Sequence, residues 1–458
     1  MQITMIGAGY VGLATGTCLA NMGHSVRCFD INAARIVRLE HFDIPIYEPG
    51  LEEAMRSAVE AGRLSFSTRL RESVAEADAV FIAVGTPSGA DGSIDLSHVL
   101  AAAKQIGPHL RRGATVVIKS TVVVGTARRV REIIARERGA FDIRVASNPE
   151  FLREGSAMKD FMEPDRIVLG ADDTRSRNIL RAIYRPFERA GVPMVITTTG
   201  NAELIKYSAN AFLALKIGFI NDVADLCEKT GGDIADVTRG IGLDRRIGES
   251  FLLPGPGFGG SCFPKDTRAF AATGRQFGAP QKLVETLIAR NDQRKLLLAR
   301  RILKEGRLAP ESTVAVLGLA FKANTDDVRE AAALSIIPAL QEAGLRVVAH
   351  DPKAVPNAKE HLQDVAWADC PYAACTDASA VVILTEWDEY RRLNLDRVAR
   401  ALSGDALFDF RNLFDPRSVG QHGLRYFSLG RAATSVRQKG GISPIDRWDR
   451  RVAAPGHA

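Results

Sequence analysis

One segment places a cysteine beside a lysine and an aspartate, which are residue types that do chemistry together. Cys262 lies in GPGFGGSCFPKDTRAF, where Pro264 suits the first turn of a helix, so the thiol is expected just before the helix begins. The positive end of the helix dipole and the Lys265 cation would lower the thiol pKa and favour a nucleophilic thiolate. Asp266, four residues on, is within reach across the first turn. The preceding glycines leave room for a substrate. The alternative is a buried structural cysteine, the commoner fate of this residue type.

Two further pairs of polar residues repeat the four-residue spacing. Lys206 and Asn210 share one face of a long predicted helix, and the apolar neighbours of Lys206 mean that its charge needs a partner. Glu150 and Glu154, in NPEFLREG, follow a predicted strand. For each pair the alternative is an ordinary solvated face.

A glycine-rich turn near the N-terminus predicts a dinucleotide site. The motif GAGYVG, residues 7–12, follows a predicted strand and opens a predicted helix, whose free N–H groups would face a pyrophosphate. The next strand ends in Asp30, 18 residues after Gly12, which fits the carboxylate that binds a ribose 2′-hydroxyl. That carboxylate favours NAD over NADP, although Arg35 could accept a 2′-phosphate. The alternative is a structural turn with a chance aspartate.

The elements that must position these residues form two alternating regions around a helical one. Residues 1–196 and 312–430 alternate short apolar runs with helical patterns, which predicts parallel sheets covered on both faces. Between them, residues 197–300 open with a helical stretch from 197 to 232, which we expect to join the outer domains and to form a subunit interface. We therefore predict an α/β protein with two doubly wound Rossmann-like domains joined by a long central helix, assembled as a homodimer or higher oligomer.

The predicted strands and the tail complete this outline. The second region has only one glycine, Gly318, at its first turn, so we do not expect it to bind a dinucleotide in the same way. Residues 431–458 lack periodicity and are predicted to be disordered. The expected strands lie in QITMIGAG, SVRCFD, DAVFIAVGTP, TVVIKST, IRVASNPEF, RIVLGA, STVAVLGLAFK, LRVVAHDP, ASAVVILTEW and ALFDFRN.

Composition sets limits on the class of protein. A length of 458 residues suggests about three structural units, and 46% hydrophobic with 25% charged residues is ordinary for a globular protein. The net charge of +6 comes without a long Lys/Arg block, so a phosphate-bearing substrate is favoured over nucleic acid. Six cysteines without framework spacing, and no secretory signal, predict a reducing, cytoplasmic location. No uncharged apolar run approaches 18 residues, so we expect no membrane span, and no His/Cys cluster has metal-ligand spacing.

At this point a family resemblance becomes visible over residues 1 to about 430. The chain resembles the UDP-glucose/GDP-mannose dehydrogenase family, and within it the enzymes acting on UDP-glucose. The carriers of the resemblance are ordered motifs: GAGYVGL at 7–13, VGTP at 84–87, KSTVVVGT at 119–126, NPEFLREGSA at 148–157, PDRIVLG at 164–170, ELIKYSANAFLALKIGFIND at 203–222, GFGGSCFPKDTRA at 257–269 and GLAFKANTDDVREA at 318–331.

The resemblance implies roles for individual residues. Cys262 is the nucleophile, assisted by Lys206, Asn210 and Asp266, while Thr121, Glu150 and Glu154 order the catalytic water or bind substrate. The positions implied for NAD are Gly7, Gly9, Val11, Gly12, Asp30, Arg35, Thr86, Thr121, Glu154, Lys265 and Arg329. Those implied for the sugar nucleotide are Glu150, Phe151, Leu152, Arg153, Glu154, Lys206, Asn210, Phe251, Leu252, Leu253, Pro254, Gly255, Gly259 and Lys322, with Arg246 reaching the neighbouring subunit's substrate.

The implied reaction is an NAD-dependent, four-electron oxidation of UDP-glucose to UDP-glucuronate. Cys262 would capture the intermediate aldehyde as a thiohemiacetal, a second oxidation would leave a thioester, and water would release the acid. Lys206 and Asn210 would stabilise oxyanions, Asp266 would handle protons and Glu154 would steer the hydrolytic water. The rival substrates are GDP-mannose and other UDP-sugars, but the stretch GSAMKDFMEPDRIVLG favours the UDP-glucose branch. UDP-N-acetylmannosamine enzymes usually lack the Lys-Asp pair after the cysteine. A non-catalytic NAD-binding protein, the alternative from another class, would not need these residues together.

Overall fold

The computed structural model describes residues 1–89, 91–139 and 142–432. This part of the chain divides into two compact units, each with its own sheet. Unit 1 contains Met1–Gly218, Gly257–Arg294 and Ala320–Ala331, and unit 2 contains Phe219–Pro256, Lys295–Leu319 and the chain from Ala332 onward. The segment Ala320–Ala331 therefore follows the first strand of the unit 2 sheet but belongs to unit 1. Residues 433–458, most of the predicted tail, lie outside the described part.

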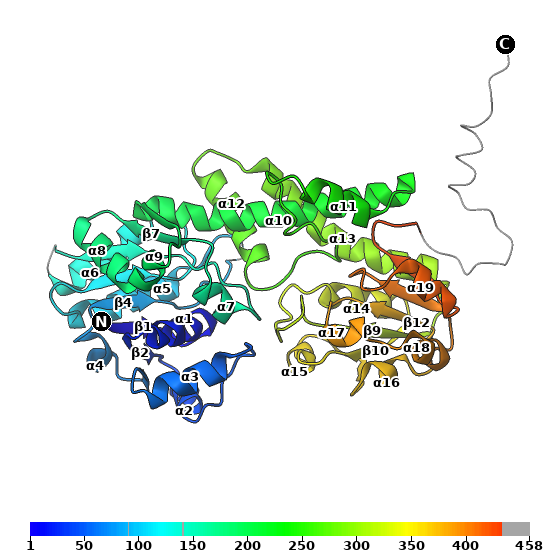
Figure 1. Ribbon diagram of the computed structural model, residues 1–458, viewed down its shortest axis with the longest axis horizontal. Helices are drawn as coiled ribbons and strands as arrows, with labels where there is room; N and C mark the ends of the chain where they lie inside the picture. The colour runs from blue at the N-terminus through cyan, green and yellow to red at the C-terminus, as the bar shows by residue number, and fades with distance from the viewer. Residues whose placement is uncertain (90, 140–141, 433–458) are drawn as a thin grey trace, which may run out of the picture. The chain divides into compact units, whose positions relative to one another are not determined.

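The sheet of unit 1 has eight strands in the order β3-β2-β1-β4-β5-β6-β7-β8, and the chain order reverses between β1 and β4. Figure 1 labels β1, β2, β4 and β7 of this sheet. All neighbours are parallel except β6 and β7, which are antiparallel. The prediction of a parallel sheet is therefore confirmed for six of the seven neighbouring pairs and wrong for that one. The strands are β1 (Gln2–Ile6), β2 (Ser25–Phe29), β3 (Leu64–Ser67), β4 (Ala79–Ile82), β5 (Thr115–Ile118), β6 (Arg144–Ser147), β7 (Ile167–Ala171) and β8 (Met194–Thr197).

Helices cover both faces of this sheet because successive side chains of a strand point in opposite directions. In β4, Phe81 belongs to one buried cluster while Val80 and Ile82 belong to the other. The first cluster includes side chains of α1, α2, α3, α7, α8 and α9, and the second includes those of α5, α6 and the start of α10. The helices are α1 (Tyr10–Asn21), α2 (Ala33–Glu40), α3 (Leu51–Glu60), α4 (Leu70–Val74), α5 (Ser97–Ile106), α6 (Thr126–Arg138), α7 (Ala157–Met162), α8 (Thr174–Ile183), α9 (Arg185–Arg189) and α12 (Phe263–Gln276), with a 3-10 turn at Gly107–His109.

Unit 2 contains a second doubly wound sheet of six parallel strands in the order β11-β10-β9-β12-β13-β14. Its strands are β9 (Thr313–Leu317), β10 (Arg346–His350), β11 (Val365–Trp367), β12 (Ala380–Ile383), β13 (Ala406–Asp409) and β14 (Arg425–Ser428). Its helices are α11 (Ile234–Gly242), α14 (Ala333–Glu342), α15 (Val355–Ala358), α16 (Pro371–Cys375), α17 (Asp388–Arg391), α18 (Leu395–Ala401) and α19 (Pro416–Gln421). Gly318, after β9, has a φ of +100°, as the first glycine of such a turn requires.

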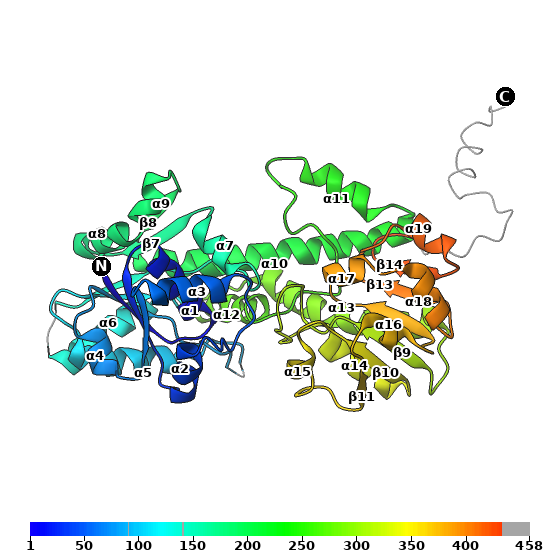
Figure 2. The ribbon, with the colours of Figure 1, turned by 60° about the horizontal axis from the view of Figure 1, so that its bottom comes forward.

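The predicted long helix is confirmed as α10 (Thr199–Thr230), which has 32 residues and is the long green helix of Figure 2. Its residues up to Gly218 belong to unit 1 and those from Phe219 to unit 2, and α13 (Lys282–Gly306) is shared in the same way. The fold is therefore the predicted one: two doubly wound Rossmann-like domains joined by a long central helix.

Candidate active site

The turn after β1 has the geometry that a bound dinucleotide requires. Gly7 has a φ of +100°, and a Cβ there would lie 2.8 Å from the backbone oxygen of Ala83. A Cβ on Gly12 would overlap the backbone oxygen of Gly7, so the helix packs directly on the turn. A Cβ on Gly9 would meet nothing within 4 Å, which leaves open space at the N-terminus of α1, and Gly9 has no side chain to cap that helix. The turn therefore fits a pyrophosphate on the helix N-terminus.

Asp30 lies where the ribose-binding carboxylate was expected, at the end of β2. It is buried, and its Oδ2 accepts hydrogen bonds from the backbone N–H of Ala8 and from Arg35 Nη1, both at 2.9 Å. The other NAD positions are placed as follows: Val11 is in the first turn of α1, and Thr86 and Thr121 are in the loops after β4 and β5. Because β4 follows β1 at the reversal of strand order, these loops border the crevice where doubly wound sheets bind ligands.

Lys206 and Glu150 form a buried ion pair, so the solvated-face alternative is wrong for both residues. Lys206 Nζ lies 3.0 Å from Glu150 Oε1, and the two side chains are only 4% and 5% exposed. Burial opposes the charge on each and is the largest single effect. It is outweighed by their mutual attraction together with the Leu152 N–H and Lys119 at Glu150, and with Asp266 and Cys262 at Lys206. The pair therefore holds the pKa of Glu150 below its usual value and that of Lys206 above its own.

Asn210 and Asp266 lie in the same cluster. Asp266 is fully buried, and its two carboxylate oxygens accept hydrogen bonds at 2.6 Å from Asn210 Nδ2 and from Lys265 Nζ. Lys206 is also close enough for Asp266 and Cys262 to raise its pKa. The structure thus brings the three assisting residues and the thiol together, although they come from two segments of the chain, α10 and the start of α12.

Cys262 precedes α12 directly, as predicted, with Pro264 in the first turn. The prediction of a lowered thiol pKa is wrong. Burial and the Glu150 carboxylate raise the pKa of Cys262 to about 11, and the opposing effect of Lys206 is too small to reverse this. The Lys265 ammonium, expected to help, instead pairs with Asp266. Cys262 as a residue is partly buried, and the charges of Glu150, Lys206 and Asp266 act on its thiol.

Glu154 lies beside the thiol rather than on a solvated face. Its side chain is 11% exposed, and its Oε1 accepts a hydrogen bond of 2.6 Å from Ser261 and lies 3.5 Å from Arg329 Nη2. Burial and the neighbouring Asp327 carboxylate raise the pKa of Glu154 to about 7, against the opposing effects of Ser261 and Arg329. Arg329 is held in turn by Asp327, with contacts of 2.9 and 2.8 Å.

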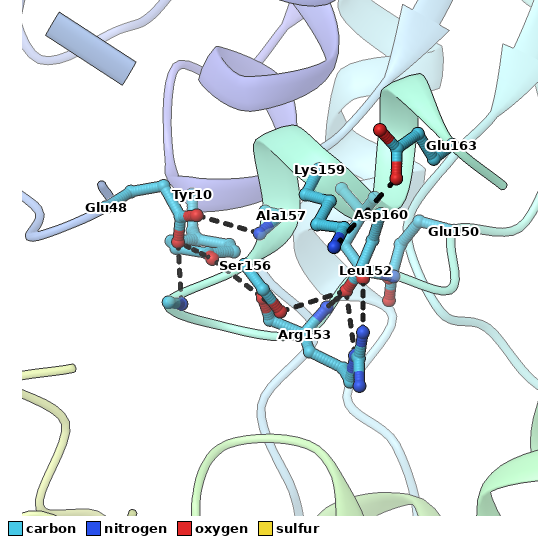
Figure 3. A network of polar contacts seen from close by, with 11 residues as sticks. Tyr10, Glu48, Glu150, Leu152, Arg153, Ser156, Ala157, Lys159, Asp160 and Glu163 are labelled. Carbon is cyan, nitrogen blue, oxygen red and sulfur yellow. Dashed lines mark hydrogen bonds and ion pairs between the residues drawn. The ribbon is translucent and has the colours of Figure 1, made fainter. Parts of the chain in front are cut away.

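The loop that carries both glutamates is held at its ends by a polar network (Figure 3). Glu48 accepts hydrogen bonds from Tyr10 Oη and, at 2.7 Å, from the backbone N–H groups of Gly155 and Ala157. Arg153 pairs with Asp160 through two of its guanidinium nitrogens, Nε and Nη2. The network anchors the residues on either side of Glu154 and so restricts its position.

The remaining residues of this loop also face the Lys206 region. The Phe151 ring lies between two cations, with Arg166 Cζ at 3.8 Å and Lys206 Nζ at 5.3 Å from its centroid. The backbone N–H of Leu152 donates to Glu150 at 2.6 Å. The aromatic ring and the backbone thus fix the carboxylate against the lysine.

The other residues expected at the sugar nucleotide fall in both units. Gly259 and Lys322 belong to unit 1, and a Cβ on Gly259 would lie 2.5 Å from the Glu330 backbone oxygen. The loop of Phe251, Leu252, Leu253, Pro254 and Gly255 belongs to unit 2, where the Gly255 N–H donates to Asn221 Oδ1 at 2.9 Å. Arg246 is also in unit 2 and highly exposed, and its guanidinium contacts only its neighbour Asp244 among the pairs observed.

Sequence reasoning missed several residues that complete the cluster. Lys119 is buried behind the site, bonded to Asn148 Oδ1 at 3.0 Å, and burial lowers its pKa to about 8. The sequence could have indicated Lys119, because a lysine directly after a buried apolar strand is unusual. Glu203 accepts bonds from the N–H groups of Gly125 and Ala127, and burial raises its pKa to about 7. Glu48 and Ser261 carried no such signal, because their partners are distant in sequence.

The described residues contain neither a candidate metal site nor a membrane-spanning helix. No group of three or more His, Cys, Asp or Glu side chains in the described ranges could hold a metal ion. In the same ranges no helix is long and apolar enough to cross a bilayer.

A glycine-rich turn at the reversal point of a doubly wound sheet, with a buried carboxylate after the next strand, defines an NAD-dependent dehydrogenase. Three domain profiles of one family match the chain in order: the NAD binding domain at residues 1–188, the central domain at 200–293 and the UDP binding domain at 315–416. The chain belongs to the UDP-glucose/GDP-mannose dehydrogenase family.

Known relatives agree with this assignment over almost the whole chain. The UDP-glucose 6-dehydrogenase of Rhizobium meliloti (strain 1021) is 50% identical over 435 residues, covering 94% of this chain and 100% of that protein. The UDP-glucose 6-dehydrogenase of Pseudomonas aeruginosa is 47% identical over 443 residues, covering 94% and 98%. The structure of a UDP-glucose dehydrogenase from the archaeon Pyrobaculum islandicum matches with a TM-score of 0.86 at 40% identity, covering 94% and 98%.

Proposed function

We propose that this enzyme oxidises the C6 alcohol of UDP-glucose to a carboxylate, with Cys262 as the covalent nucleophile. The observation that carries the proposal is the cluster of Cys262, Lys206, Asn210 and Asp266 in the same compact unit as the NAD turn. Its substrate follows from the relatives of 50% and 47% identity, both named as UDP-glucose 6-dehydrogenases, and from the matched UDP binding domain.

The residues of the cluster have complementary tasks in this reaction. Cys262 captures the C6 aldehyde as a thiohemiacetal, so that the reactive intermediate stays bound between the two oxidations. Lys206 and Asn210 donate hydrogen bonds to the oxyanions that form, and donors of this kind are each worth about 3–4 kcal/mol of barrier. Asp266 orients Asn210 and Lys265 through its two short hydrogen bonds. Thr121 and Glu150 bind the sugar or the water that releases the acid.

NAD bound at the turn supplies the hydride acceptor for each oxidation. Gly7, Gly9, Val11 and Gly12 would hold its pyrophosphate, and Asp30 with Arg35 its ribose. Thr86, Thr121, Glu154, Lys265 and Arg329 would line the rest of its site. On the sugar-nucleotide side we assign Phe151, Leu152, Arg153, Gly259 and Lys322 in unit 1, with Arg246 and the loop Phe251–Gly255 in unit 2.

A panel of sugar nucleotides tests the substrate. The wild-type enzyme is incubated with UDP-glucose, GDP-mannose or UDP-N-acetylmannosamine and with NAD or NADP, and absorbance at 340 nm is followed. We expect UDP-glucose with NAD to give the highest kcat/KM. A higher value for GDP-mannose or for another UDP-sugar would assign the enzyme to a different branch of the family, and no reduction with any pair would favour a binding protein.

We also propose that the chain forms a homodimer through α10. Phe212, Phe219 and Leu226 are 64%, 60% and 60% exposed and recur every seven residues, so they lie on one face of the helix. A stripe of large, exposed apolar side chains on one face of a helix supports a protein interface. In such a dimer Arg246 would reach the substrate of the other subunit. Light scattering that finds a monomer at micromolar concentration would contradict this proposal.

We retain the domain assignment and the location as proposals. The NAD-binding domain covers residues 1–196, the central domain with the long helix and the cysteine loop covers 197–300, and the UDP-sugar-binding domain covers 312–430. The six cysteines are all free thiols, which supports a reducing, cytoplasmic location. Cell fractionation followed by immunoblotting tests the location.

A further inference from the structure

The thiol of Cys262 presents a chemical problem for the proposed function. With a pKa raised to about 11 by burial and by Glu150, the sulfur carries its proton at neutral pH. A neutral thiol is a weak nucleophile, so its proton must leave as the sulfur attacks the aldehyde carbon. A hydrogen-bonded acceptor therefore has to lie within reach of the sulfur.

Most charged groups that face the sulfur are unsuited to accept that proton. Lys206 and Arg329 are cations. Glu150 already accepts bonds from Lys206 and from the N–H of Leu152, which keep it ionised. Asp266 accepts from Asn210 and Lys265, one bond on each oxygen. Both oxygens of Asp266 are therefore occupied by donors, and the contacts of Glu150 hold its pKa below the usual value.

Ser261 connects the sulfur to a third carboxylate. Its Oγ lies 3.4 Å from Cys262 Sγ and donates a hydrogen bond of 2.6 Å to Glu154 Oε1. A serine has one hydroxyl hydrogen, and an ionised carboxylate has none to give. Because the serine hydrogen points to Glu154, the hydrogen between Oγ and Sγ must be the thiol's. The chain of donors therefore runs in one direction, from sulfur to serine to carboxylate.

The three groups are held together by contacts within unit 1. The backbone N–H of Gly260 donates to the Arg329 oxygen at 2.7 Å, and Arg268 pairs with Glu330 at 2.8 Å. Gly260 has a φ of +82°, and a Cβ there would lie 2.7 Å from the Phe321 ring. The turn before Ser261 is thereby fixed on the segment Ala320–Ala331, which also supplies the Asp327 and Arg329 neighbours of Glu154.

Glu154 has the proton affinity that a general base at neutral pH needs. Burial and Asp327 raise its pKa to about 7, while Ser261 and Arg329 oppose the rise. Tyr10 also senses the charge on Glu154. The second carboxylate oxygen of Glu154, Oε2, is buried and has no hydrogen-bond donor among the described residues. A base with a pKa near the working pH is the most effective kind.

We propose that Ser261 relays the proton of the Cys262 thiol to Glu154 while the sulfur attacks the aldehyde. This rests on the proposed function, because the aldehyde is that of the sugar nucleotide. The S–H bond breaks as the S–C bond forms. The sulfur proton goes to Ser261 Oγ, and the serine proton goes to Glu154 Oε1. The carbonyl π electrons move to the oxygen, next to Lys206. When water forms a C–O bond to the acyl carbon and the C–S bond breaks, the two water protons go to solvent, and the departing thiolate recovers its proton from Glu154 by the same path.

The test uses the 6-aldehyde of UDP-glucose with NAD, and kcat/KM is measured between pH 6 and 10. In the wild type kcat/KM should rise through about pH 7 and then level off, because Glu154 must be ionised. In Ser261→Ala it should fall at pH 7 by about 100-fold, the size typical of general base catalysis. It should then keep rising tenfold per pH unit toward pH 10, because only the pre-formed thiolate reacts. Glu154→Gln should behave like Ser261→Ala, and Ser261→Thr, which keeps a hydroxyl, should recover the wild-type profile.

A matched control separates the relay from a structural effect. Ser176 donates to the Asp173 carboxylate at 2.5 Å at the start of α8, so Ser176→Ala removes the same kind of contact elsewhere in unit 1. Its kcat/KM profile should keep the wild-type shape. If Ser261→Ala does not fold, the wild type still tests the proposal: its kcat/KM in H2O/D2O mixtures should follow a curve, since two protons move together.

The outcomes separate the two proposals. The relay alone would be overturned if kcat/KM of Ser261→Ala and Glu154→Gln levelled off with pH as it does in the wild type. It would also be overturned if kcat/KM of the wild type changed linearly, or not at all, with the fraction of D2O. A wild type that reduces no NAD with UDP-glucose or its aldehyde would overturn the proposed function, and the relay with it.

Discussion

The ion pair between Lys206 and Glu150 gives the sharpest stability prediction, because both side chains are almost completely buried. Lys206→Met removes the cation and leaves a buried carboxylate. Breaking a buried pair in this way costs about 3–5 kcal/mol. Glu150 keeps the hydrogen bond from the Leu152 N–H and the attraction of Lys119, so we expect a loss of about 3 kcal/mol, at the lower end of that range. The double variant Lys206→Met/Glu150→Gln should recover most of the loss, since neither charge remains.

The pH dependence gives this prediction an internal check. In the wild type Glu150 has a lowered pKa, so its contribution to stability is present above the pKa of the unfolded chain and is lost as the pH falls. In Lys206→Met the lysine no longer offsets the effect of burial on Glu150, so the pKa of Glu150 should rise above its value in the unfolded chain. Protonation then relieves the buried charge, so the difference from wild type should be smaller at pH 5 than at pH 8.

Urea denaturation at pH 5 and pH 8 measures both effects. The tryptophans are Trp367, Trp387 and Trp448, so unit 1 contains none and fluorescence reports on the rest of the chain. Circular dichroism follows the unfolding of both units. An unfolding transition that appears in circular dichroism but not in tryptophan fluorescence therefore belongs to unit 1. Arg181→Met breaks an exposed ion pair with Glu188 in the same unit and should change stability by about 1 kcal/mol or less. A Lys206→Met variant that matches this control at pH 8, or a loss independent of pH, would refute the reasoning.

Three further predictions follow from the turn, the thiol and the helix. Gly12→Ala should lower the melting temperature and abolish NAD binding in calorimetry, because its Cβ overlaps the Gly7 oxygen. Gly9→Ala should have the melting temperature of the wild type and only bind NAD more weakly, because its Cβ meets nothing within 4 Å. Equal melting temperatures for the two variants would contradict this prediction. Alkylation of Cys262 by iodoacetamide, followed by mass spectrometry without substrates, should accelerate from pH 8 to pH 10 because burial raises the pKa to about 11, and a plateau below pH 8 would show an ionised thiol. Phe219→Glu should weaken self-association about tenfold or more in light scattering, and an unchanged dimer would exclude this face of α10.

The parts of the fold that were predicted are those encoded by local pattern. Apolar runs predict the buried strands, and one long stretch of helical periodicity predicts α10, so both could be predicted from the sequence. The four strands that were missed, β3, β8, β11 and β14, are short and lie at the sheet edges, where only one neighbour pairs with them. The antiparallel pairing of β6 and β7 was also missed, because a strand's direction depends on the connection and not on its composition.

The site divides in the same way. The position of Cys262 before α12 follows from Pro264 and the glycines beside it, and this prediction is confirmed. Its pKa does not follow from local sequence. The helix dipole and Lys265 led us to expect a low thiol pKa. Burial and Glu150, which is 112 positions away in the chain, raise the pKa instead. A separation of 107 positions likewise made the contact of Ser261 with Glu154 unpredictable from local sequence.

The central claim is that Cys262 carries the substrate through both oxidations. Counting the NADH formed per UDP-glucose, in the wild type and in Cys262→Ala side by side, tests it most directly. We expect two NADH per sugar from the wild type and failure of the variant to complete the second oxidation. Two NADH per sugar from Cys262→Ala at the wild-type rate would contradict the account.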